Sequence, residues 1–187
     1  PPFEPEGERY RPGFPYVLYA GNFRPHKNVP CLLRAFHGID YPELRLLLTG
    51  HPDANIAAQV ARLGLEGRVC FLGTLSDAEL AAVYRGALCL VFPSLMEGFG
   101  LPALEAMACG TPTIVSNRAA LPEVAGDAGV LVDPDDAAEL RRAMEKVLGA
   151  PKLRAAMRKA GLERAGCYRW HRVAARVREV LEAALGS

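Results

Sequence analysis

The sequence predicts an α/β protein built on a mostly parallel, doubly wound sheet of about six strands, with helices on both faces. Short runs rich in leucine and β-branched residues alternate with helix-length segments, which is the pattern of repeated βα units. The predicted strands are short and apolar on both faces, as strands buried between two helix layers are. The chain has 187 residues, of which 50% are hydrophobic and 23% charged. This length and composition suit one globular domain that needs no disulfide or metal.

Each predicted strand is bounded by turn residues. The six strands are Tyr16–Gly21, Leu44–Thr49, Arg68–Leu72, Cys89–Pro93, Thr111–Ser116 and Gly129–Val132. An open parallel sheet binds its ligand beyond the carboxyl ends of its strands, where the strand order reverses. The loops to inspect are therefore Gly21–Lys27, Gly50–Asp53, Gly73–Asp77, Ser94–Leu101 and Asn117–Glu123.

Capping signals mark where the helices begin. The predicted starts are Asn28 for a helix to about His37, Asp53 or Ala54 for one to Leu63, Ser76 with Glu79 as a capping box, Pro102 for one that ends before Gly110, and Asp135 or Asp136. Helical spacing resumes after Pro151, and the last helix gathers Trp170, Val173, Val177 and Leu181 on one side. We expect residues 1–15 to form a linker, 16–167 a Rossmann-like domain, and 168–187 an amphipathic helix.

Charge and cysteine usage exclude several classes of protein. The net charge of +1 offers no general attraction to nucleic acid. Residues 151–187 carry nine basic and three acidic residues, so this segment could approach an anionic membrane surface or an acidic partner, although a solvated helix face explains it equally. No apolar run approaches the ~20 residues of a membrane helix, and the proline-rich start lacks the features of a signal peptide. The five cysteines form no C-x-x-C pair, so we expect no metal site and a reducing, cytoplasmic location.

The segment from Ser94 to Pro102 contains two glycines and leads into a predicted helix. Glycine lets the backbone approach a ligand, and a helix amino terminus offers free N–H groups to an anion. The segment therefore predicts a phosphate cradle, with an ordinary strand-to-helix turn as the alternative. Glu97 and Glu105 flank it, and carboxylates there are better suited to accept hydrogen bonds from sugar hydroxyls than to face phosphate. Together they favour a nucleotide sugar, unless Glu105 only complements the helix dipole and Glu97 is only solvated.

Lys27 stands immediately before a predicted helix amino terminus, in the loop from Gly21 to Asn28. A cation at the positive end of a helix dipole is unfavourable, and a phosphate bound between the two would resolve the conflict. Lys27 is therefore a candidate to stabilise a departing diphosphate, assisted by Arg24 or His26. The alternative is an exposed lysine.

Two further motifs fit other functions less well. The spacing Gly98-x-Gly100-x-x-Ala103 matches a loosened dinucleotide fingerprint, but Asn117 stands where an acidic ribose partner would be expected. The acidic run 133–136 is similar to a metal-binding aspartate triplet of other sugar transferases, but here it ends a strand and caps a helix. We interpret the run as structural, and a nicotinamide oxidoreductase as a weaker alternative.

Several of these segments closely resemble the carboxyl-terminal domain of retaining GT-B glycosyltransferases of family four. The resemblance rests on residues 97–112 (EGFGLPALEAMACGTP), Ser116-Asn117 and residues 121–124 (LPEV). It extends from the loop 25–28 (PHKN) through residues 68–73 to Tyr168-Arg169-Trp170, which is similar to the aromatic-x-Trp opening of the family's last helix. Nearly the whole chain is covered.

The resemblance implies a Rossmann-like half of a GT-B fold and a role for each matched residue. Glu97 would contact hydroxyls of the donor hexose and Glu105 the ribose, with the amides of Phe99, Gly100 and Leu101 facing the diphosphate and sugar. The implied donor-site residues are Lys27 as the phosphate-binding lysine, Glu97 and Glu105, Gly98 to Leu101 in the cradle, Gly21 and Asn22 in the first loop, and Val69 and Leu75 near the base. Members usually add an arginine where this chain has Asn22 or His26, and Arg24 is the candidate substitute.

The resemblance also implies a reaction. A hexosyl unit would be transferred with retention and without a metal, through an oxocarbenium-like transition state, from a nucleotide diphosphosugar to a glycan or a lipid-linked acceptor. GDP-mannose is favoured and UDP-sugars come next. A GT-B enzyme has a second, amino-terminal domain that carries the acceptor site, so we expect this chain to bind donor without efficient transfer, and its last helix to pack on that domain. The alternative is a non-catalytic nucleotide-sugar-binding module or a subunit of a split enzyme. In either case we expect the protein in the cytoplasm or at the inner face of the cytoplasmic membrane.

Overall fold

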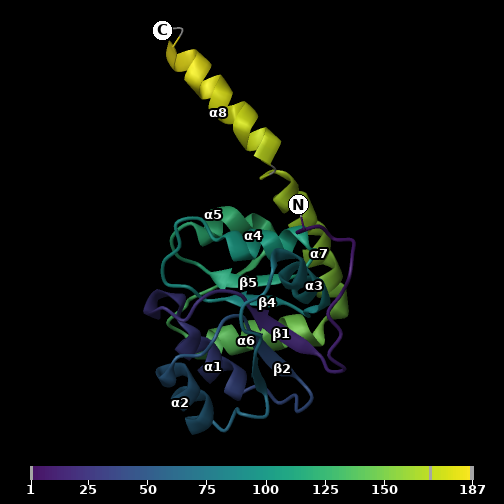
Figure 1. The fold of residues 1–187 in the computed structure, drawn as a ribbon, viewed down its shortest axis with the longest axis vertical. Helices are drawn as coiled ribbons and strands as arrows, with labels where there is room; N and C mark the ends of the chain where they lie inside the picture. Colours follow the sequence, from purple (N-terminus) through teal and green to yellow (C-terminus); the bar gives the residue numbers. More distant parts are fainter. Residues whose placement is uncertain (1, 169, 186–187) are drawn as a thin grey trace.

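A computed structural model describes residues 2–168 and 170–185 and contains a six-stranded, fully parallel sheet with strand order β3-β2-β1-β4-β5-β6 (Figure 1). The strands are β1 (Tyr16–Tyr19), β2 (Arg45–Leu48), β3 (Val69–Phe71), β4 (Leu90–Phe92), β5 (Thr113–Ser116) and β6 (Val130–Val132). Each lies within a segment predicted from the sequence. The strand order reverses between β1 and β4, so the predicted doubly wound sheet is confirmed.

Helices cover both faces of the sheet (Figure 1). On one face lie α1 (Val29–His37), α2 (Ala54–Arg62) and α6 (Ala137–Gly149); on the other lie α3 (Asp77–Gly86), α4 (Leu101–Ala108), α5 (Leu121–Ala125) and α7 (Pro151–Gly166). Two single-turn 3-10 helices, η1 (Pro25–Lys27) and η2 (Gly126–Ala128), complete the domain. The segment that ends at Glu123 was predicted to be a loop, yet α5 begins at Leu121. A five-residue helix is too short for a periodic signal, and burial of Leu121, Val124 and Ala125 stabilises it.

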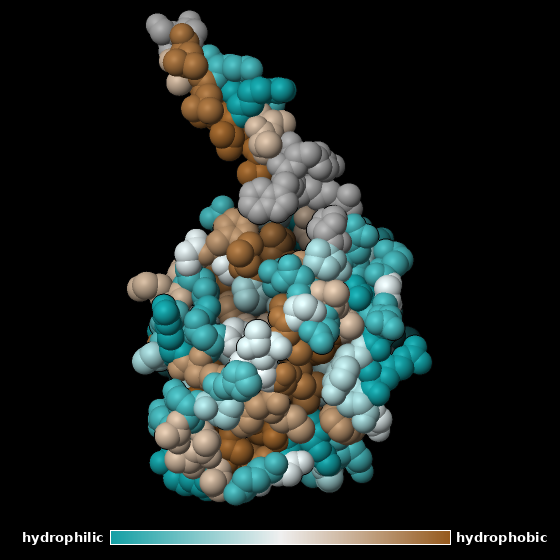
Figure 2. All heavy atoms as spheres, in the orientation of Figure 1, coloured by the Kyte–Doolittle hydropathy of each residue, from teal (hydrophilic) through white to brown (hydrophobic). Residues whose placement is uncertain are grey.

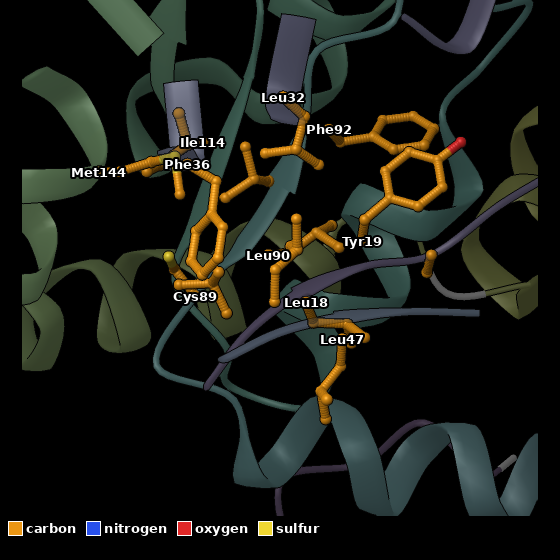
Figure 3. Packing of buried hydrophobic residues seen from close by; sticks show 14 of the residues in the cluster. Leu18, Tyr19, Leu32, Phe36, Leu47, Cys89, Leu90, Phe92, Ile114 and Met144 are labelled. Atoms are coloured by element: carbon orange, nitrogen blue, oxygen red, sulfur yellow. The ribbon is translucent and has the colours of Figure 1, made fainter. Parts of the chain in front are cut away.

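The core lies between the sheet and the two helix layers (Figure 3). Leu18 and Leu90 occupy the central strands and are fully buried. Phe36 of α1 and Met144 of α6 pack on the same side, which brings the two halves of the chain together around one core. Burial of this kind contributes roughly 25 cal/mol per Å² of apolar surface and is the main source of stability for such a domain.

Most of the predicted helix caps are confirmed. Ser76 and Glu79 form a reciprocal capping box at α3, Asp53 accepts a hydrogen bond from the Ile56 amide at α2, and Asp136 accepts two at α6. Asn28 is an exception, because it is left-handed (φ 56°) and its side chain does not cap α1. That side chain instead binds two carbonyl groups elsewhere, as described below.

The predicted linker, of which residues 2–15 are described, contains no helix or strand and lies along α3. The buried guanidinium of Arg85 donates to the carbonyls of Glu8 (2.6 Å), Glu4 (3.1 Å) and Pro2 (3.2 Å). Phe3 adds an edge-to-face contact with the ring of Tyr84. These contacts attach the segment to the domain.

Three arginines of the basic segment lie on α7 and donate hydrogen bonds to backbone carbonyls elsewhere in the domain. Arg154 donates to the carbonyls of Val147 and Leu148, Arg158 to that of Gly110, and Arg164 to that of Val124. They attach α7 to the carboxyl ends of α6, α4 and α5. The excess of positive charge in residues 151–187 therefore arises in part from packing.

The last helix, α8 (Trp170–Leu185), confirms the predicted terminal helix and points away from the sheet in Figure 1. Its apolar side chains form a stripe along one side in Figure 2, and they are exposed, from 38% for Val173 to 87% for Leu185. Arg169 of the predicted aromatic-x-Trp motif and the side chain of Trp170 lie outside the described residues. Within the described residues no helix is long and apolar enough to cross a membrane.

Candidate functional site

The loops that follow β1 and β4 meet where the strand order reverses, at the carboxyl edge of the sheet. The connections that follow the two neighbouring strands leave this point in opposite directions, so a crevice forms there in open parallel sheets. The Leu95 amide donates to the His26 carbonyl (2.8 Å), which joins the two loops directly. The sequence-predicted residues of both loops therefore lie at one place in the fold.

Lys27 and Glu97 form an ion pair across these two loops, with 2.7 Å between Nζ and Oε1. Their side chains are only 12% and 11% exposed. The Lys27 ammonium also lies 5.1 Å from the centre of the Phe92 ring, a cation–π contact. The two residues for which the resemblance implies contacts to phosphate and to sugar hydroxyls are thus adjacent and form an ion pair with each other.

The Asn28 amide group anchors the first loop. Its Nδ2 donates to the carbonyls of Pro134 (2.7 Å) and Pro93 (3.2 Å), which belong to the loops after β6 and β4. An asparagine tolerates the left-handed backbone needed here better than most residues do. The side chain that was predicted to cap α1 therefore fixes the position of Lys27, its neighbour in sequence.

The start of the first loop is held by Tyr19. This buried side chain donates to the Asn22 carbonyl (2.5 Å), and its pKa is raised by burial and then by the charge of Glu97. A methyl group on Gly21 would lie 2.9 Å from the Tyr19 hydroxyl, and the Gly21 amide donates to Thr49 Oγ1 (2.9 Å). Gly21 and Asn22 therefore shape the loop. Arg24 is exposed and forms no ion pair within the described residues.

The predicted cradle reaches α4 through Gly100, which has a φ of +98°. A methyl group at Gly100 would lie 2.5 Å from Leu121 Cδ2, so both backbone angle and space require glycine. The amides of Phe99, Gly100 and Leu101 donate no hydrogen bond to any described residue. They and the positive end of α4 are available to an anion. At Gly98 a methyl group would meet nothing within 4 Å, so the fold itself gives no steric reason for glycine there.

Glu105 lies on α4 and faces α3, where its Oε2 accepts a hydrogen bond from the hydroxyl of the buried Tyr84 (3.1 Å). Burial raises the pKa of the Glu105 carboxyl, the Tyr84 hydrogen bond lowers it, and Asp77 raises it. Glu105 makes no hydrogen bond or ion pair with Lys27 or Glu97 within the described residues. One of its two carboxylate oxygens has a described partner, which leaves the other for a ligand.

The region predicted to lie near the base divides into two parts. Leu75 is partly buried in the loop after β3, at the carboxyl edge of the sheet. Val69 begins β3, pairs with Leu46 and is 6% exposed. It lies in the core at the far end of the strand, so we remove it from the candidate site.

The acidic run is structural as interpreted, since Asp136 caps α6 and Arg118 forms ion pairs with Asp133 (3.1 Å) and Asp135 (2.6 Å). No cluster of three or more His, Cys, Asp and Glu side chains that could hold a metal occurs in the described part of the chain.

Comparison with known families identifies the family to which the chain belongs. The model of the family "Glycosyl transferases group 1" matches residues 3–164. The chain belongs to this family. It is 42% identical over 127 residues to "O-antigen chain mannosyltransferase B" of Escherichia coli, a match that covers 65% of this chain and 33% of that protein. The group 1 chain thus spans about a third of that relative.

Two solved structures have the same fold. Sucrose-phosphate synthase from Thermosynechococcus elongatus is 33% identical with a TM-score of 0.82, and the match covers 93% of this chain and 46% of that one. The carboxyl-terminal domain of a glycosyl transferase group 1 protein from Francisella tularensis is 25% identical with a TM-score of 0.77, over 89% of this chain and 95% of that one. The predicted resemblance to GT-B glycosyltransferases is confirmed.

The structure adds residues to the candidate site that the sequence analysis did not identify. Tyr84 supports Glu105, Phe92 lies beside Lys27, and Phe23 packs against Tyr19 and Phe71 at the edge of the first loop. Phe92 lies near the end of the predicted strand 89–93, next to the cradle, so its position in the sequence could have indicated that it belongs to the site. No local pattern links Tyr84 to Glu105.

Replacing Gly100 by alanine is expected to lower the free energy of unfolding by about 1–3 kcal/mol, because the new methyl group is strained and contacts Leu121. Gly98→Ala is the matched control and is expected to change it little. Urea denaturation of both variants measures the difference. Equal stability of the two would contradict the assigned geometry.

Tyr84→Phe removes a hydrogen bond that lowers the pKa of Glu105, while the burial that raises it remains. The Glu105 pKa is therefore expected to move further upward. A carboxyl-¹³C NMR titration of both chains measures it. An unchanged or lower value in Tyr84→Phe would show that the hydroxyl does not stabilise the carboxylate.

Proposed function

We propose that this chain is the donor-binding domain of a retaining hexosyltransferase that uses a nucleotide diphosphosugar, with GDP-mannose first and UDP-sugars second. The observation that carries the proposal is the adjacency of Lys27, Glu97 and the free amino terminus of α4 at the switch point. A diphosphosugar presents an anion beside a polyhydroxylated ring, and this site presents donors for the anion beside an acceptor for hydroxyls. The name of the Escherichia coli relative supports mannose as the sugar.

Donor binding requires Lys27 and Glu97 to exchange partners. In the structure they neutralise each other in a largely buried setting. In the proposed complex the diphosphate takes the Lys27 ammonium, and hexose hydroxyls donate to Glu97. Both charges then keep a partner, which avoids the cost of leaving a buried charge unpaired.

The proposed reaction breaks the bond between the anomeric carbon and the diphosphate oxygen and forms a bond from that carbon to the oxygen of an acceptor hydroxyl, whose proton passes to the departing diphosphate. Negative charge accumulates on the departing diphosphate as the sugar becomes oxocarbenium-like. Lys27 and the amides at Phe99, Gly100 and Leu101 are placed to stabilise that charge without a metal. Glu105 anchors the ribose through its free oxygen, with Leu75 beside the base. Arg24 is the proposed additional phosphate ligand.

The acceptor, a glycan or a lipid-linked sugar, is proposed to bind to a second, amino-terminal domain. The relatives that this chain matches are longer, and the apolar stripe of α8 offers a surface on which that domain would pack. On this proposal the present chain binds donor but transfers little. Cytoplasmic location, with peripheral contact to the inner membrane face, is part of the same proposal. The alternative is a nucleotide-sugar-binding subunit with no catalysis of its own.

Calorimetric titration with guanosine, GDP, GDP-mannose, UDP, UDP-glucose and NAD is the direct test. Glu105→Ala is expected to weaken nucleotide binding by about 1–3 kcal/mol, since ribose hydroxyls lose their acceptor, and Glu105→Gln by less. Lys27→Ala is expected to weaken the binding of nucleoside diphosphates far more than the binding of guanosine. Lys159→Ala, an exposed lysine of α7, is the control. Selective binding of NAD, or full affinity in both Glu105 variants, would refute the assigned site.

Glu97→Gln separates the two halves of the donor. Removing the carboxylate frees Lys27 and removes negative charge near the phosphates, so GDP is expected to bind more tightly than to the unmodified chain. The added affinity of GDP-mannose over GDP is expected to shrink, because the hexose loses its acceptor. The same titrations measure both effects. Weaker GDP binding combined with an unchanged mannose contribution would contradict the partner exchange.

A further inference from the structure

A second concave site lies at the opposite edge of the sheet, where β4 and β5 begin. It is a pocket of about 180 Å³ bordered by Leu88 and Pro112, the residues just before these strands. Four arginines line it: Arg9, Arg85, Arg154 and Arg158. Because the strands are parallel, this edge is the one away from Lys27 and the cradle.

The side chains that line this pocket carry positive charge and no negative charge. Its lining contains no Asp or Glu, and none of the ion pairs in the described part of the chain includes one of the four arginines. The hydrogen bonds that Arg85, Arg154 and Arg158 make go to neutral backbone carbonyls. Arg154 and Arg158 each use only Nη1, so their other donors have no partner within the described residues.

The negative partial charges of helix carboxyl ends neutralise only part of this positive charge. The helices α3, α4 and α6 all end at this edge, and each contributes a partial charge of roughly −0.5. The four guanidinium groups are always protonated and contribute one full positive charge each. A substantial positive excess therefore remains in the pocket.

The backbone is shaped to admit one of these groups. Gly110 has a φ of +73°, and a methyl group there would lie 2.6 Å from Cζ of Arg158. Glycine at this position lets the guanidinium lie over the backbone and donate to the Gly110 carbonyl (3.1 Å). The backbone at Gly110 thus holds the Arg158 guanidinium in place at the pocket.

We infer that this pocket binds a tetrahedral oxyanion, either inorganic phosphate or the phosphate group of a larger molecule. Guanidinium groups pair with phosphate through parallel hydrogen bonds, and several here have free donors. The volume is below the roughly 300–1,000 Å³ of sites that enclose drug-sized ligands, so the pocket takes one phosphate group and little else. The inference does not depend on the proposed donor site.

Isothermal calorimetry of the 187-residue chain with inorganic phosphate tests the inference. Arg158→Gln and Arg9→Gln each remove one charge of the pocket, and each is expected to weaken phosphate binding about tenfold. Arg9 is exposed and makes no described hydrogen bond, so its variant is expected to fold normally. Lys159→Gln removes the same charge from an exposed neighbour on α7 and is expected to have no effect.

Lys27→Ala distinguishes this pocket from the donor site, since phosphate could also bind Lys27. Binding that persists in Lys27→Ala and weakens in Arg158→Gln and Arg9→Gln supports the inference. Binding that disappears in Lys27→Ala and is unchanged in both arginine variants overturns it without affecting the proposed function.

Vesicle sedimentation identifies the source of the phosphate group. The chain is mixed with vesicles of phosphatidylcholine alone or of phosphatidylcholine with phosphatidic acid. Sedimentation that requires phosphatidic acid, Arg9 and Arg158 supports a lipid headgroup, whereas binding of inorganic phosphate alone supports a soluble ligand. Binding in neither experiment, or binding insensitive to both arginines, overturns the inference.

Discussion

The ion pair between Lys27 and Glu97 depends on the reversal of strand order between β1 and β4, and the candidate site is built around it. Two charges that are each about one-tenth exposed lose much of their hydration, and their attraction repays that loss only in part. An apolar pair would pack there without this cost. A buried pair beside an open helix amino terminus is therefore better explained by ligand chemistry than by stability.

The loops around this pair are held by hydrogen bonds within the domain. The Asn28 amide joins the loops after β1, β4 and β6, the His26 carbonyl accepts from Leu95, and Tyr19 holds the start of the first loop. Rigid positioning reduces the entropy that must be lost on binding. The donor amides at the start of α4 are likewise fixed by Gly100, whose backbone angle no other residue adopts without strain. The fold thus holds the polar groups of the candidate site in fixed positions.

The two edges of the sheet differ because every strand runs in the same direction. Helix amino ends collect at the carboxyl edge, where they favour anions, and helix carboxyl ends collect at the opposite edge, where they favour cations. Arg154, Arg158 and Arg164 follow this rule by donating to carbonyls at helix ends. The same arrangement that attaches α7 to the domain also concentrates guanidinium groups beside β4 and β5, and so produces a second place for an anion. Packing and ligand recognition are therefore connected through α7.

The sequence alone determined the six strands, most helix caps, the family and the composition of the donor loops, because these depend on local periodicity, capping residues and glycine positions. Only the tertiary structure decided which side chains meet. It joined Lys27 to Glu97 across 70 positions of sequence, gave Glu105 its partner Tyr84, moved Asn28 from a cap to a loop anchor, and placed Val69 in the core. It also formed the short helix α5 by burying Leu121 and gathered four arginines from distant segments into one pocket. Such contacts arise from the order of strands in the sheet, which no local pattern encodes.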